Sequence, residues 1–429
     1  MPRGRQGSRI QTEESGLMAH TVESQLSLVK RGVEEVIPEK ELANKFKEAS
    51  RGKRALRIKF GADPTAPDLH LGHLVILRKL RQFQELGHQI TFIIGDFTAM
   101  IGDPSGKIET RPKLSQSEIK KNAVTYQKQI FKLLDPGKTE VLFNSSWLGK
   151  MDVSYFLKLS SRYTVARMLE RDDFFKRYKD KKPITILEFL YPLLQGYDSV
   201  KIQADIEIGG FDQKFNLLVA RDLQREYKQV PQVVLMLPLL EGTDGVKKMS
   251  KSYGNYIAIN EPAQTMYGKI MSIPDSLIIK YFELLTDVDK QIIKKIKGEV
   301  SQGSLNPRDA KERLAIEIVG TFYPEKEVEE AGQEFKRIYV DKTLPAKVTV
   351  IKKLPAALKK EIKGGSIWLV RLLTQTRLVS SGKKARSLIT QGGIQIDGET
   401  IKNIDYHLEL SREHIIKVGK HIFRKILAQ

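Results

Sequence analysis

The chain has 429 residues, with 72 lysines and arginines against 52 aspartates and glutamates, so its formal net charge is +20. A chain of this length predicts about two to four domains, and a hydrophobic fraction of 41% is ordinary for a globular protein. No apolar run reaches the roughly twenty residues of a membrane span, so we expect no membrane partner. The absence of cysteine excludes disulfides and thiolate zinc sites.

Residues 1–50 are interpreted as an N-terminal tail followed by a helical lead-in. Arg3, Arg5 and Arg9 make the extreme end basic, but acidic residues soon interrupt it, and no apolar signal-peptide core follows. We therefore expect a disordered tail on a cytoplasmic protein.

Residues 51–262 predict a Rossmann-like α/β domain built on a parallel sheet. A predicted strand at 55–60 is followed by a helix whose apolar stripe runs over 74–86, and then by the apolar run 90–94. Such a run is typical of a strand buried on both faces, and a second one occupies 233–237. In open sheets of this class, ligands bind at the carboxyl ends of the strands.

The rest of the chain predicts an insertion, a helical domain and a small terminal module. Charged helical patterns near 110–185 indicate an insertion, and 263–345 predicts an α-helical domain. The lysine- and proline-rich stretch 346–365 predicts a linker, and 366–429 predicts a compact α+β unit. From Lys352 to the end, 16 lysines and arginines stand against 6 acidic residues, which indicates a polyanionic partner.

Two histidines lie at the junction between the first predicted strand and the helix that follows it. Gly72, between His70 and His73, allows close approach to the backbone, and a helix N-terminus favours anions. Two imidazoles there can donate to phosphate oxygens. Such a pair could instead hold a metal, but the chain has no cysteine and the nearby acids Asp63 and Asp68 lie on the preceding loop, so we predict no metal held by the protein itself.

A second cluster is the segment Lys248–Ser252, which follows Gly242 and Gly245. Glycines allow the loop to move, and two lysines supply positive charge against a triphosphate; a merely solvated lysine loop is the alternative. Other nucleotide motifs fit less well. The run Gly102–Lys107 is one residue short of a P-loop, and no G-x-G-x-x-G opens the first helix.

Together these two motifs resemble the paired signatures of class I aminoacyl-tRNA synthetases. Three further segments, Ile101–Lys107, Tyr191–Asp198 and Gly209–Gln213, resemble tyrosyl-tRNA synthetases. The resemblance implies that the chain activates L-tyrosine with ATP and bound Mg²⁺ and then esterifies tRNA(Tyr). It also implies a homodimer.

The same resemblance implies roles for individual residues. The expected catalytic groups are Thr65, His70, His73, Lys107, Arg111, Lys248 and Lys251. The expected ATP contacts are Asp63, Gly72, Gly210, Asp212, Met249, Ser250 and Lys251. The expected tyrosine contacts are Asp103, Tyr191 and Gln195 for the ammonium, Gln213 near the carboxylate, and Asp198 for the phenol hydroxyl.

Two positions depart from the family pattern. Lys59 stands where better-known members carry a tyrosine that contacts the substrate phenol, so hydroxyl recognition rests mainly on Asp198 or on another group. A pocket with a buried acceptor loses a bond when phenylalanine enters. Phe211 stands where members usually have a small or hydroxyl residue.

The C-terminal segment Ser381–Glu399 resembles the S4-type RNA-binding fold. Lys383, Lys384 and Arg386 crowd the start of a predicted helix, where positive charge opposes the helix dipole but suits phosphate binding. We therefore expect these three residues to contact RNA, with a solvated surface as the alternative.

Three rival functions remain open at this point. One is a tryptophan-specific sister enzyme, which the Gly209–Gln213 run and the S4-like segment disfavour. Another is a non-enzymatic RNA-binding protein, against which the intact histidine and lysine motifs argue. The third is a generic adenylate-forming enzyme, which has no reason to carry an RNA module.

Overall fold

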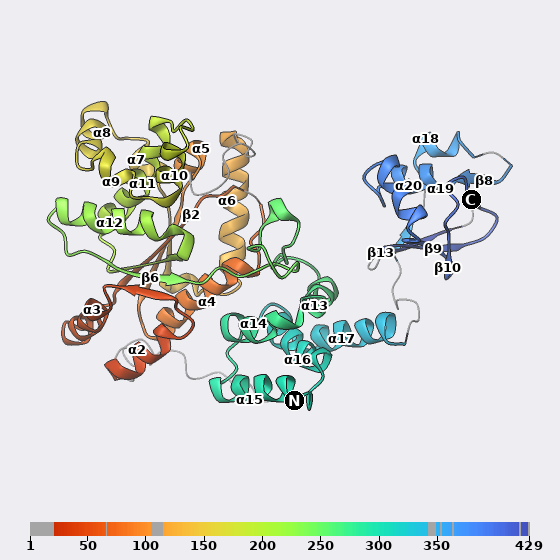
Figure 1. The fold of residues 1–429 in the computed structure, drawn as a ribbon, viewed down its shortest axis with the longest axis horizontal. Coiled ribbons are helices and arrows are strands. Elements are labelled where there is room, and N and C mark those ends of the chain that lie inside the picture. The colour runs from red at the N-terminus through yellow and green to blue at the C-terminus, as the bar shows by residue number, and fades with distance from the viewer. Residues whose placement is uncertain are drawn as a thin grey trace, which may run out of the picture. The chain divides into compact units, whose positions relative to one another are not determined.

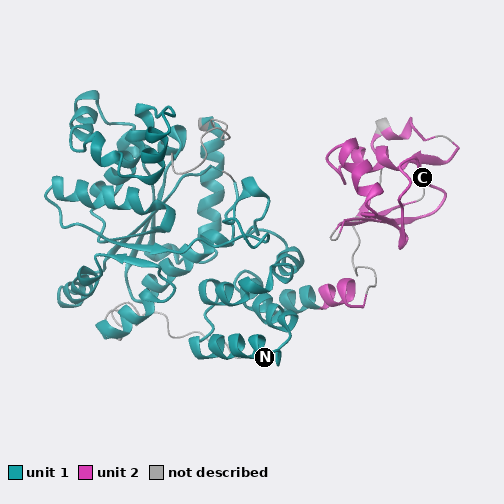
Figure 2. Cartoon of the chain, in the orientation of Figure 1, with its two compact units in different colours: residues 1–332 teal, residues 333–429 magenta. Residues whose placement is uncertain are grey.

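The computed structural model describes residues 21–65, 67–103, 115–341, 349–351, 354–362, 364–419 and 422–427. The chain forms two compact units, residues 1–332 and 333–429, which Figure 2 shows in teal and magenta. None of the described helices is long and apolar enough to cross a membrane.

A six-stranded sheet with the order β1-β6-β5-β2-β3-β4 lies at the centre of the first unit (Figure 1). Its strands are β1 (Glu35–Ile37), β2 (Arg57–Ala62), β3 (Gln89–Ile94), β4 (Thr139–Phe143), β5 (Ile206–Gly210) and β6 (Val233–Leu237). Only β1 runs antiparallel to its neighbour among these pairings. Every residue of β6 is buried, as the continuous apolar run predicts for a strand covered on both faces. The predicted α/β class is confirmed.

Helices cover both faces of this sheet. The helices of this part of the chain are α2 (Val22–Lys30), α3 (Glu39–Arg51), α4 (Leu71–Glu85), α5 (Thr98–Ile101), α6 (Gln116–Ile130), α7 (Ser145–Leu148), α8 (Val153–Ser160), α9 (Val165–Met168), α10 (Asp172–Lys179), α11 (Ile186–Ile202) and α12 (Lys214–Glu226). From β2 the chain continues to β3 and β4 on one side of the sheet, through α4 and α6. From β5 it continues to β6 on the other side, through α12. Because parallel crossovers are right-handed, these two sets cover opposite faces. The strand order therefore reverses between β2 and β5, where open α/β sheets bind ligands.

The predicted insertion at 110–185 needs a correction. It contains β4, which pairs in parallel with β3 and forms the edge of the central sheet. The sequence hides this strand because Thr139–Phe143 is only partly buried, as an edge strand is, and so lacks a continuous apolar run. The inserted part is consequently smaller than the sequence indicates.

The segment after the sheet is helical through Tyr339. Its helices are α13 (Ala263–Met271), α14 (Ile278–Leu285), α15 (Lys290–Ser301), α16 (Pro307–Gly320) and α17 (Glu325–Tyr339). Local chemistry sets their starts: the Asn306 side chain accepts from the backbone of Arg308, and Pro307 occupies the first turn of α16. The helix α14 packs against α4, so this segment supports the helix that carries the histidines.

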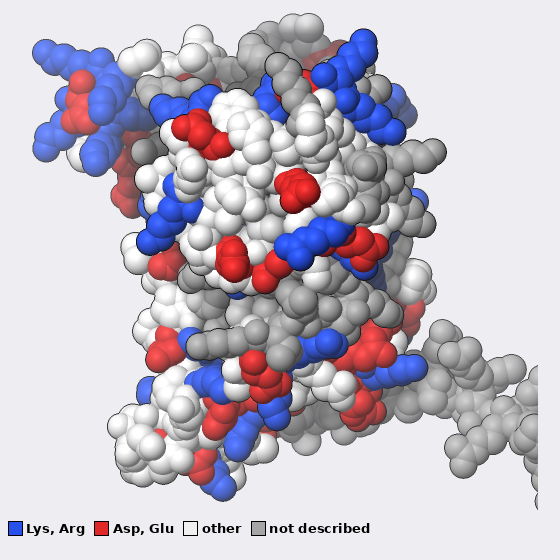
Figure 3. Space-filling view, turned by 90° about the vertical axis from the view of Figure 1, so that its right-hand side faces the viewer, with Lys and Arg blue, Asp and Glu red and all other residues white. Residues whose placement is uncertain are grey.

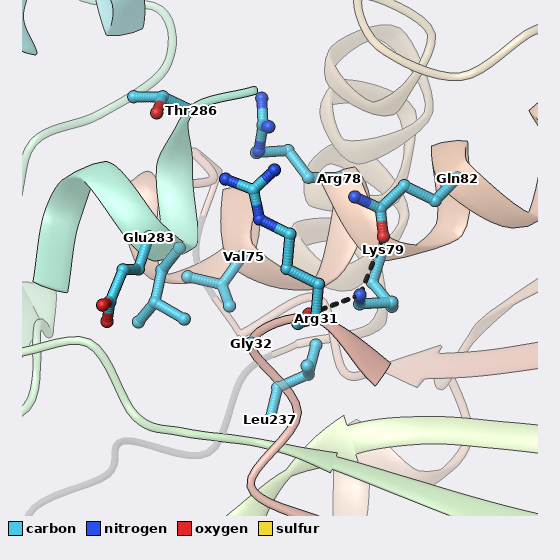
Figure 4. Close-up of a pocket in the computed structure, with 10 residues that line it drawn as sticks. Arg31, Gly32, Val75, Arg78, Lys79, Gln82, Leu237, Glu283 and Thr286 are labelled. Carbon is cyan, nitrogen blue, oxygen red and sulfur yellow. Dashed lines mark hydrogen bonds between the residues drawn. The ribbon is translucent and has the colours of Figure 1, made fainter. Parts of the chain in front are cut away.

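A small pocket lies where the turn after α2 meets α4 and α14 (Figure 4). The ammonium of Lys79 is turned inward and donates to the Arg31 carbonyl and to Oε1 of Gln82, both at 2.7 Å. Burial lowers the pKa of Lys79 to about 7. Lys79 thus links α4 to the turn after α2.

The second unit has its own sheets and core. Its strands are β7 (Thr349–Ile351), β8 (Ser366–Trp368), β9 (Ile394–Ile396), β10 (Glu399–Thr400), β11 (His407–Glu409), β12 (His414–Val418) and β13 (Ile422–Ile426). They form a five-stranded sheet, β10-β9-β12-β13-β7, and a two-stranded sheet, β11-β8. Its helices are α18 (Ala356–Lys359), α19 (Leu369–Gln375) and α20 (Gly382–Thr390).

The predicted linker at 346–365 also needs a correction. Strand β7 pairs in parallel with β13, and Leu354 and Leu358 are 3% and 0% exposed within the core of the second unit. Lysines surround these apolar residues in the sequence and hide their period. The described part of this stretch therefore belongs to the folded C-terminal unit.

Candidate active site

The two histidines cap the helix α4. Nδ1 of His70 accepts from the backbone N–H of Gly72 at 3.2 Å, and Nδ1 of His73 accepts from the backbone N–H of His70 at 3.3 Å. Burial lowers the pKa of His70 to about 2 and that of His73 to about 4, and the charge of Lys251 adds to both effects. Both rings are therefore neutral near pH 7. Because Nδ1 is an acceptor in each, the ring proton lies on Nε2.

The structure brings the lysine loop beside these histidines. Leu71 donates its backbone N–H to the Ile257 carbonyl at 3.0 Å, and His70 forms a β-bridge with Ala258. Met249 is buried against the start of α4, where a Cβ on Gly72 would lie 3.8 Å from its Cβ. The two motifs, far apart in the sequence, thus converge at one place.

Asn255 organises the loop that carries the lysines. Its Nδ2 donates to Oδ2 of Asp244 at 3.0 Å and to the carbonyls of Lys247 and Lys248 at 3.2 Å each. Its Oδ1 accepts from the backbone N–H of Ser250 at 2.8 Å. Asn255 is only 3% exposed, so one buried amide determines the conformation of the segment.

The two lysines have different surroundings. Lys248 forms an ion pair of 2.9 Å with Asp212, which follows β5. Nζ of Lys251 is buried, lies 4.0 Å from Asp68, and has no hydrogen-bond partner among the described residues. Burial lowers the pKa of Lys251, while the Asp68 carboxylate opposes that shift. An ammonium in this state has unused donors for an anion.

One face of α11 presents the predicted tyrosine contacts, because Tyr191, Gln195 and Asp198 are spaced by four and three positions. The Tyr191 hydroxyl donates to Oδ2 of Asp63 at 2.9 Å. Burial raises the pKa of Asp63 to about 7, and the Thr98 hydroxyl, which donates to it at 2.7 Å, opposes the shift. Asp63 thus directs the Tyr191 side chain.

Amide side chains connect the remaining predicted contacts. Asn216 donates to Oε1 of Gln195 and to Oε1 of Gln213, both at 3.0 Å. Gln213 in turn donates to Oδ2 of Asp103 at 2.8 Å. Asn216 is 1% exposed and comes from α12, and no sequence pattern singles it out.

Asp198 is buried at the far end of this face. Trp147 donates its Nε1–H to Oδ1 of Asp198 at 2.8 Å, and Asn144 donates to Oδ2 at 3.3 Å. Burial raises the pKa of Asp198 to about 6. The positive charge of Lys59 has the largest effect in the lowering direction. Sequence reasoning missed Trp147 and Asn144 because it missed β4. Asn144 follows the carboxyl end of that strand, where ligand-contacting residues of such sheets lie.

Gly210 and Asp212 lie directly after β5. A Cβ on Gly210 would lie 2.7 Å from Oδ1 of Asp212, so only glycine leaves this carboxylate in place. Phe211 is 38% exposed, and the ammonium of Lys214 lies 5.5 Å from its ring centroid. Its bulk therefore does not fill the space beside Asp212.

The backbone N–H of Thr65 donates to the Asp63 carbonyl at 2.8 Å in the loop after β2. The predicted residues Lys107 and Arg111 lie outside the described part of the chain. Within the described ranges, no three histidine, aspartate or glutamate side chains gather as metal ligands.

The predicted RNA contacts lie on α20 of the second unit. Ser381 caps this helix by accepting from the backbone N–H of Lys384 at 3.3 Å, and the guanidinium of Arg386 lies 5.5 Å from the Trp368 ring centroid. Lys383, Lys384 and Arg386 are all exposed. On the face that Figure 3 shows, basic and acidic side chains are interspersed and leave wide uncharged areas.

Comparison with known proteins places this site in a family. Residues 51–340 match the model of class I tRNA synthetases for tryptophan and tyrosine, and residues 349–423 match the C-terminal domain of SYY-like tyrosine–tRNA ligases. The chain is 54% identical to the tyrosine–tRNA ligase of Carboxydothermus hydrogenoformans, over 94% of this chain and 97% of that protein.

The chain belongs to the tyrosine–tRNA ligases. The tyrosine–tRNA ligase of Thermotoga maritima is 50% identical over 95% of this chain and 98% of that protein. The tyrosyl-tRNA synthetase of Archaeoglobus fulgidus, solved with L-tyrosine, has the same fold, with a TM-score of 0.58, 24% identity, and coverage of 73% of this chain and 100% of that one. As a tyrosine–tRNA ligase of class I, the chain uses ATP in a ligase reaction.

The comparisons also decide between the rival functions. The first family model covers tryptophan and tyrosine enzymes alike, so it does not choose between them. The C-terminal match and the full-length relatives both select tyrosine. A generic adenylate-forming enzyme and a protein that only binds RNA fit neither result.

Proposed function

We propose that this chain activates L-tyrosine with ATP at the carboxyl ends of β2 and β5 and then transfers the tyrosyl group to the 3′ end of tRNA(Tyr). The observation that carries the proposal is the convergence of three elements at one place. The neutral histidines of α4 and the under-bonded ammonium of Lys251 lie close together, and the polar face of α11 ends beside the same strands.

The chemical step needs positioning rather than a general base. The tyrosine carboxylate is already ionised and attacks the α-phosphorus of ATP, and pyrophosphate leaves from the opposite side with the electrons of the broken bond. Thr65 and His70 donate to the γ-phosphate, and His73 steadies the nucleotide through Nε2–H. Lys248 and Lys251 neutralise the departing charge, together with Lys107 and Arg111 from outside the described residues.

The nucleotide lies along the start of α4 and the lysine loop. Gly72, Met249 and Ser250 give it backbone contact, while Asp63 approaches the α-phosphate side through the loop after β2. Gly210 and Asp212 meet the ribose, which requires Lys248 to leave its ion pair with Asp212. Mg²⁺ would enter bound to ATP and would neutralise part of the phosphate charge there.

Tyrosine lies against α11. Asp103, Tyr191 and Gln195 hold the ammonium, and Gln213 lies near the carboxylate. Asp198 accepts a hydrogen bond from the phenol hydroxyl. Trp147 and Asn144 hold the Asp198 carboxylate in place. Phenylalanine would leave this buried acceptor without its hydrogen bond, an effect for which tyrosine-specific synthetases are the standard illustration.

The second unit binds tRNA through Lys383, Lys384 and Arg386. These side chains are exposed at the start of α20, where they meet phosphates without reading bases. The enzyme acts in the cytoplasm, where tRNA and ATP are available.

The partner in solution is a second copy of this chain. Large apolar side chains are exposed along α8 to α11, namely Val153, Leu157, Val165, Phe175, Tyr178, Ile186 and Leu187. Their exposed fractions reach 74% for Val153 and 78% for Ile186. A concentration of this kind is typical of a protein interface, and the family resemblance favours a homodimer.

Exchange of pyrophosphate into ATP tests the proposed substrate. The purified chain should catalyse exchange with tyrosine far more efficiently than with tryptophan or phenylalanine, and it should charge tRNA(Tyr). Exchange that depends on tryptophan would overturn the proposed amino acid. A lack of exchange together with intact tRNA binding would overturn the proposed chemistry.

A further inference from the structure

Lys59 is a fully buried cation beside the proposed tyrosine pocket. Its side chain, on β2, is 0% exposed and forms an ion pair of 2.7 Å with Glu207 on β5. Its Nζ also donates to Oγ of Ser199 at 2.7 Å and to the Gln195 carbonyl at 3.1 Å. An ammonium has three hydrogens, and these three acceptors use all of them.

These contacts hold α11 against the sheet beside the proposed tyrosine pocket. Ser199 and Gln195 lie on α11, and Ser199 directly follows Asp198. The Ser199 hydroxyl donates to Oε2 of Glu207 at 3.0 Å, and Nε2 of Gln232 also donates to that oxygen. The backbone that carries Asp198 is therefore bonded to both β2 and β5 through a closed polar network. Such a network is stable only when each buried member is paired.

Lys59 also supplies the positive charge of this region. The charged or titratable groups around Asp198 are Lys59 from β2, Glu207 from β5, Asp63 from the loop after β2, and the neutral phenol of Tyr191. Burial raises the pKa of Asp198, Lys59 lowers it, and Glu207 has a smaller effect in the raising direction. Without Lys59, two buried carboxylates would face each other without a cation.

We infer that Lys59 is the positioning residue that sets tyrosine specificity: its ammonium fixes α11 against the sheet and keeps Asp198 an ionised acceptor for the phenol hydroxyl. This inference rests on the proposed role of Asp198. Lys59 acts through Asp198 and not on the substrate, because all three of its hydrogens are already used within the protein. Direct contact with tyrosine would require breaking one of these bonds.

The test is the ratio of kcat/KM for tyrosine to kcat/KM for phenylalanine in pyrophosphate exchange, measured from pH 5 to pH 9. Both substrates carry the same ammonium and carboxylate, so titration of the groups that hold those parts cancels in the ratio. What remains is the ionisation of Asp198 in the free enzyme. In the unmodified chain the ratio should fall as the pH drops through about 6.

Two single substitutions should move this midpoint in opposite directions. Lys59→Met removes the cation and should raise the midpoint by on the order of one pH unit, with a smaller ratio at pH 7. Glu207→Gln removes the competing carboxylate and should lower the midpoint. Structural damage alone would reduce the activity of both variants without giving opposite shifts. If Lys59→Met fails to fold, the double variant Lys59→Met/Glu207→Gln should still show a raised midpoint, because the effect of Lys59 is the larger of the two.

Two further variants separate the possible failures. Lys45→Met is the matched control, because Lys45 is also buried and paired with a carboxylate, at 3.8 Å from Asp205, but is not among the groups that act on Asp198. It should lower stability and leave the ratio profile unchanged. Asp198→Leu removes both acceptor oxygens and should abolish the preference for tyrosine; if the preference survives, the proposed phenol contact is wrong. If Asp198→Leu abolishes it while neither Lys59→Met nor Glu207→Gln shifts the midpoint, the inference about Lys59 is overturned and the proposed function stands.

Discussion

At the scale of single residues, burial determines the charge state of the groups at the site. His70 and His73 are neutral because burial and nearby ammonium groups disfavour the imidazolium form. In the ligand-free chain both rings are therefore neutral over the physiological pH range and carry their proton on Nε2. Asp63 behaves differently, since its pKa of about 7 lies within that range.

Asp63 predicts a pH dependence of tyrosine binding. Its raised pKa means that the free enzyme keeps the proton up to about pH 7, and a protonated Asp63 accepts less strongly from the Tyr191 hydroxyl, which is a proposed ammonium contact. Affinity should therefore be full above about pH 8 and fall as the pH drops, with KM for tyrosine up to about tenfold higher at pH 6. Steady-state exchange kinetics at fixed ionic strength would measure this change.

The control ligand for this experiment is 3-(4-hydroxyphenyl)propionate, which keeps the phenol and the carboxylate but lacks the ammonium. Its inhibition constant against tyrosine should not rise as the pH falls from 8 to 6. An equal rise for both ligands would show that the effect does not act through the ammonium and would contradict the role of Asp63.

At the scale of elements, the site depends on two loops held by buried amides. Asn144, after β4, holds Asp198, and Asn255 holds the loop that carries Lys248 and Lys251. A loop that must close over a triphosphate works best when its starting conformation is already defined. The amide of Asn255 provides this definition without adding charge.

Asn255→Ala should weaken catalysis more than substrate binding. The change removes four hydrogen bonds of one buried side chain. Their loss should destabilise the ordered conformation of the loop by about 1–3 kcal/mol. The turnover number of exchange should fall about ten- to a hundredfold, while the Kd for tyrosine, measured by equilibrium dialysis, stays within about twofold.

The matched control for this loop is Asn306→Ala, which removes another asparagine that bonds to the backbone, at the start of α16. It should cost about 1 kcal/mol of stability and leave turnover unchanged. If both asparagine variants lower turnover equally, the effect of Asn255 is general destabilisation and not loop order.

At the scale of the whole molecule, the two compact units have separate predicted roles. The first unit contains the predicted groups for ATP and tyrosine, and the second has its own core and the predicted RNA contacts. A chain that ends at Asp341 should therefore keep tyrosine-dependent exchange within about threefold and lose at least about a hundredfold in charging of tRNA(Tyr). Parallel exchange and aminoacylation assays would measure both quantities. Unchanged charging would contradict the assignment of tRNA binding to the second unit.

A milder change in the full-length chain tests the same assignment. Replacing Lys383, Lys384 and Arg386 by alanine should weaken tRNA binding. The slope of log K against log salt should become shallower by about one unit for each lost phosphate contact. Exchange activity should not change, since these side chains lie outside the first unit.

The exposed apolar side chains of α8 to α11 predict a dimer that charge should disrupt. Ile186→Lys combined with Phe175→Glu should convert the chain from dimer to monomer in sedimentation velocity experiments, because unpaired charges would be buried in the interface. Ile292→Lys is the control, since Ile292 is also exposed, at 53%, but lies on α15. A monomeric unmodified chain would refute the proposed homodimer.

The sequence by itself determined the fold class and the family, and it singled out most residues of the candidate site. The motifs around His70, Lys248 and Tyr191 depend on local spacing along one helix or one loop, which sequence order preserves. The central buried strands were equally readable, because strands covered on both faces must be apolar throughout.

Only the tertiary structure decided which groups surround those motifs. Strand β4, the folded part of the predicted linker, and the partners Trp147 and Asn144 come from stretches whose polar residues hide their burial. The role of Lys59 is the clearest case. From the sequence alone, a lysine in a strand is interpreted as a surface residue. Only the fold brings Glu207 and Ser199 to its ammonium, because burial and charge pairing depend on contacts between distant segments.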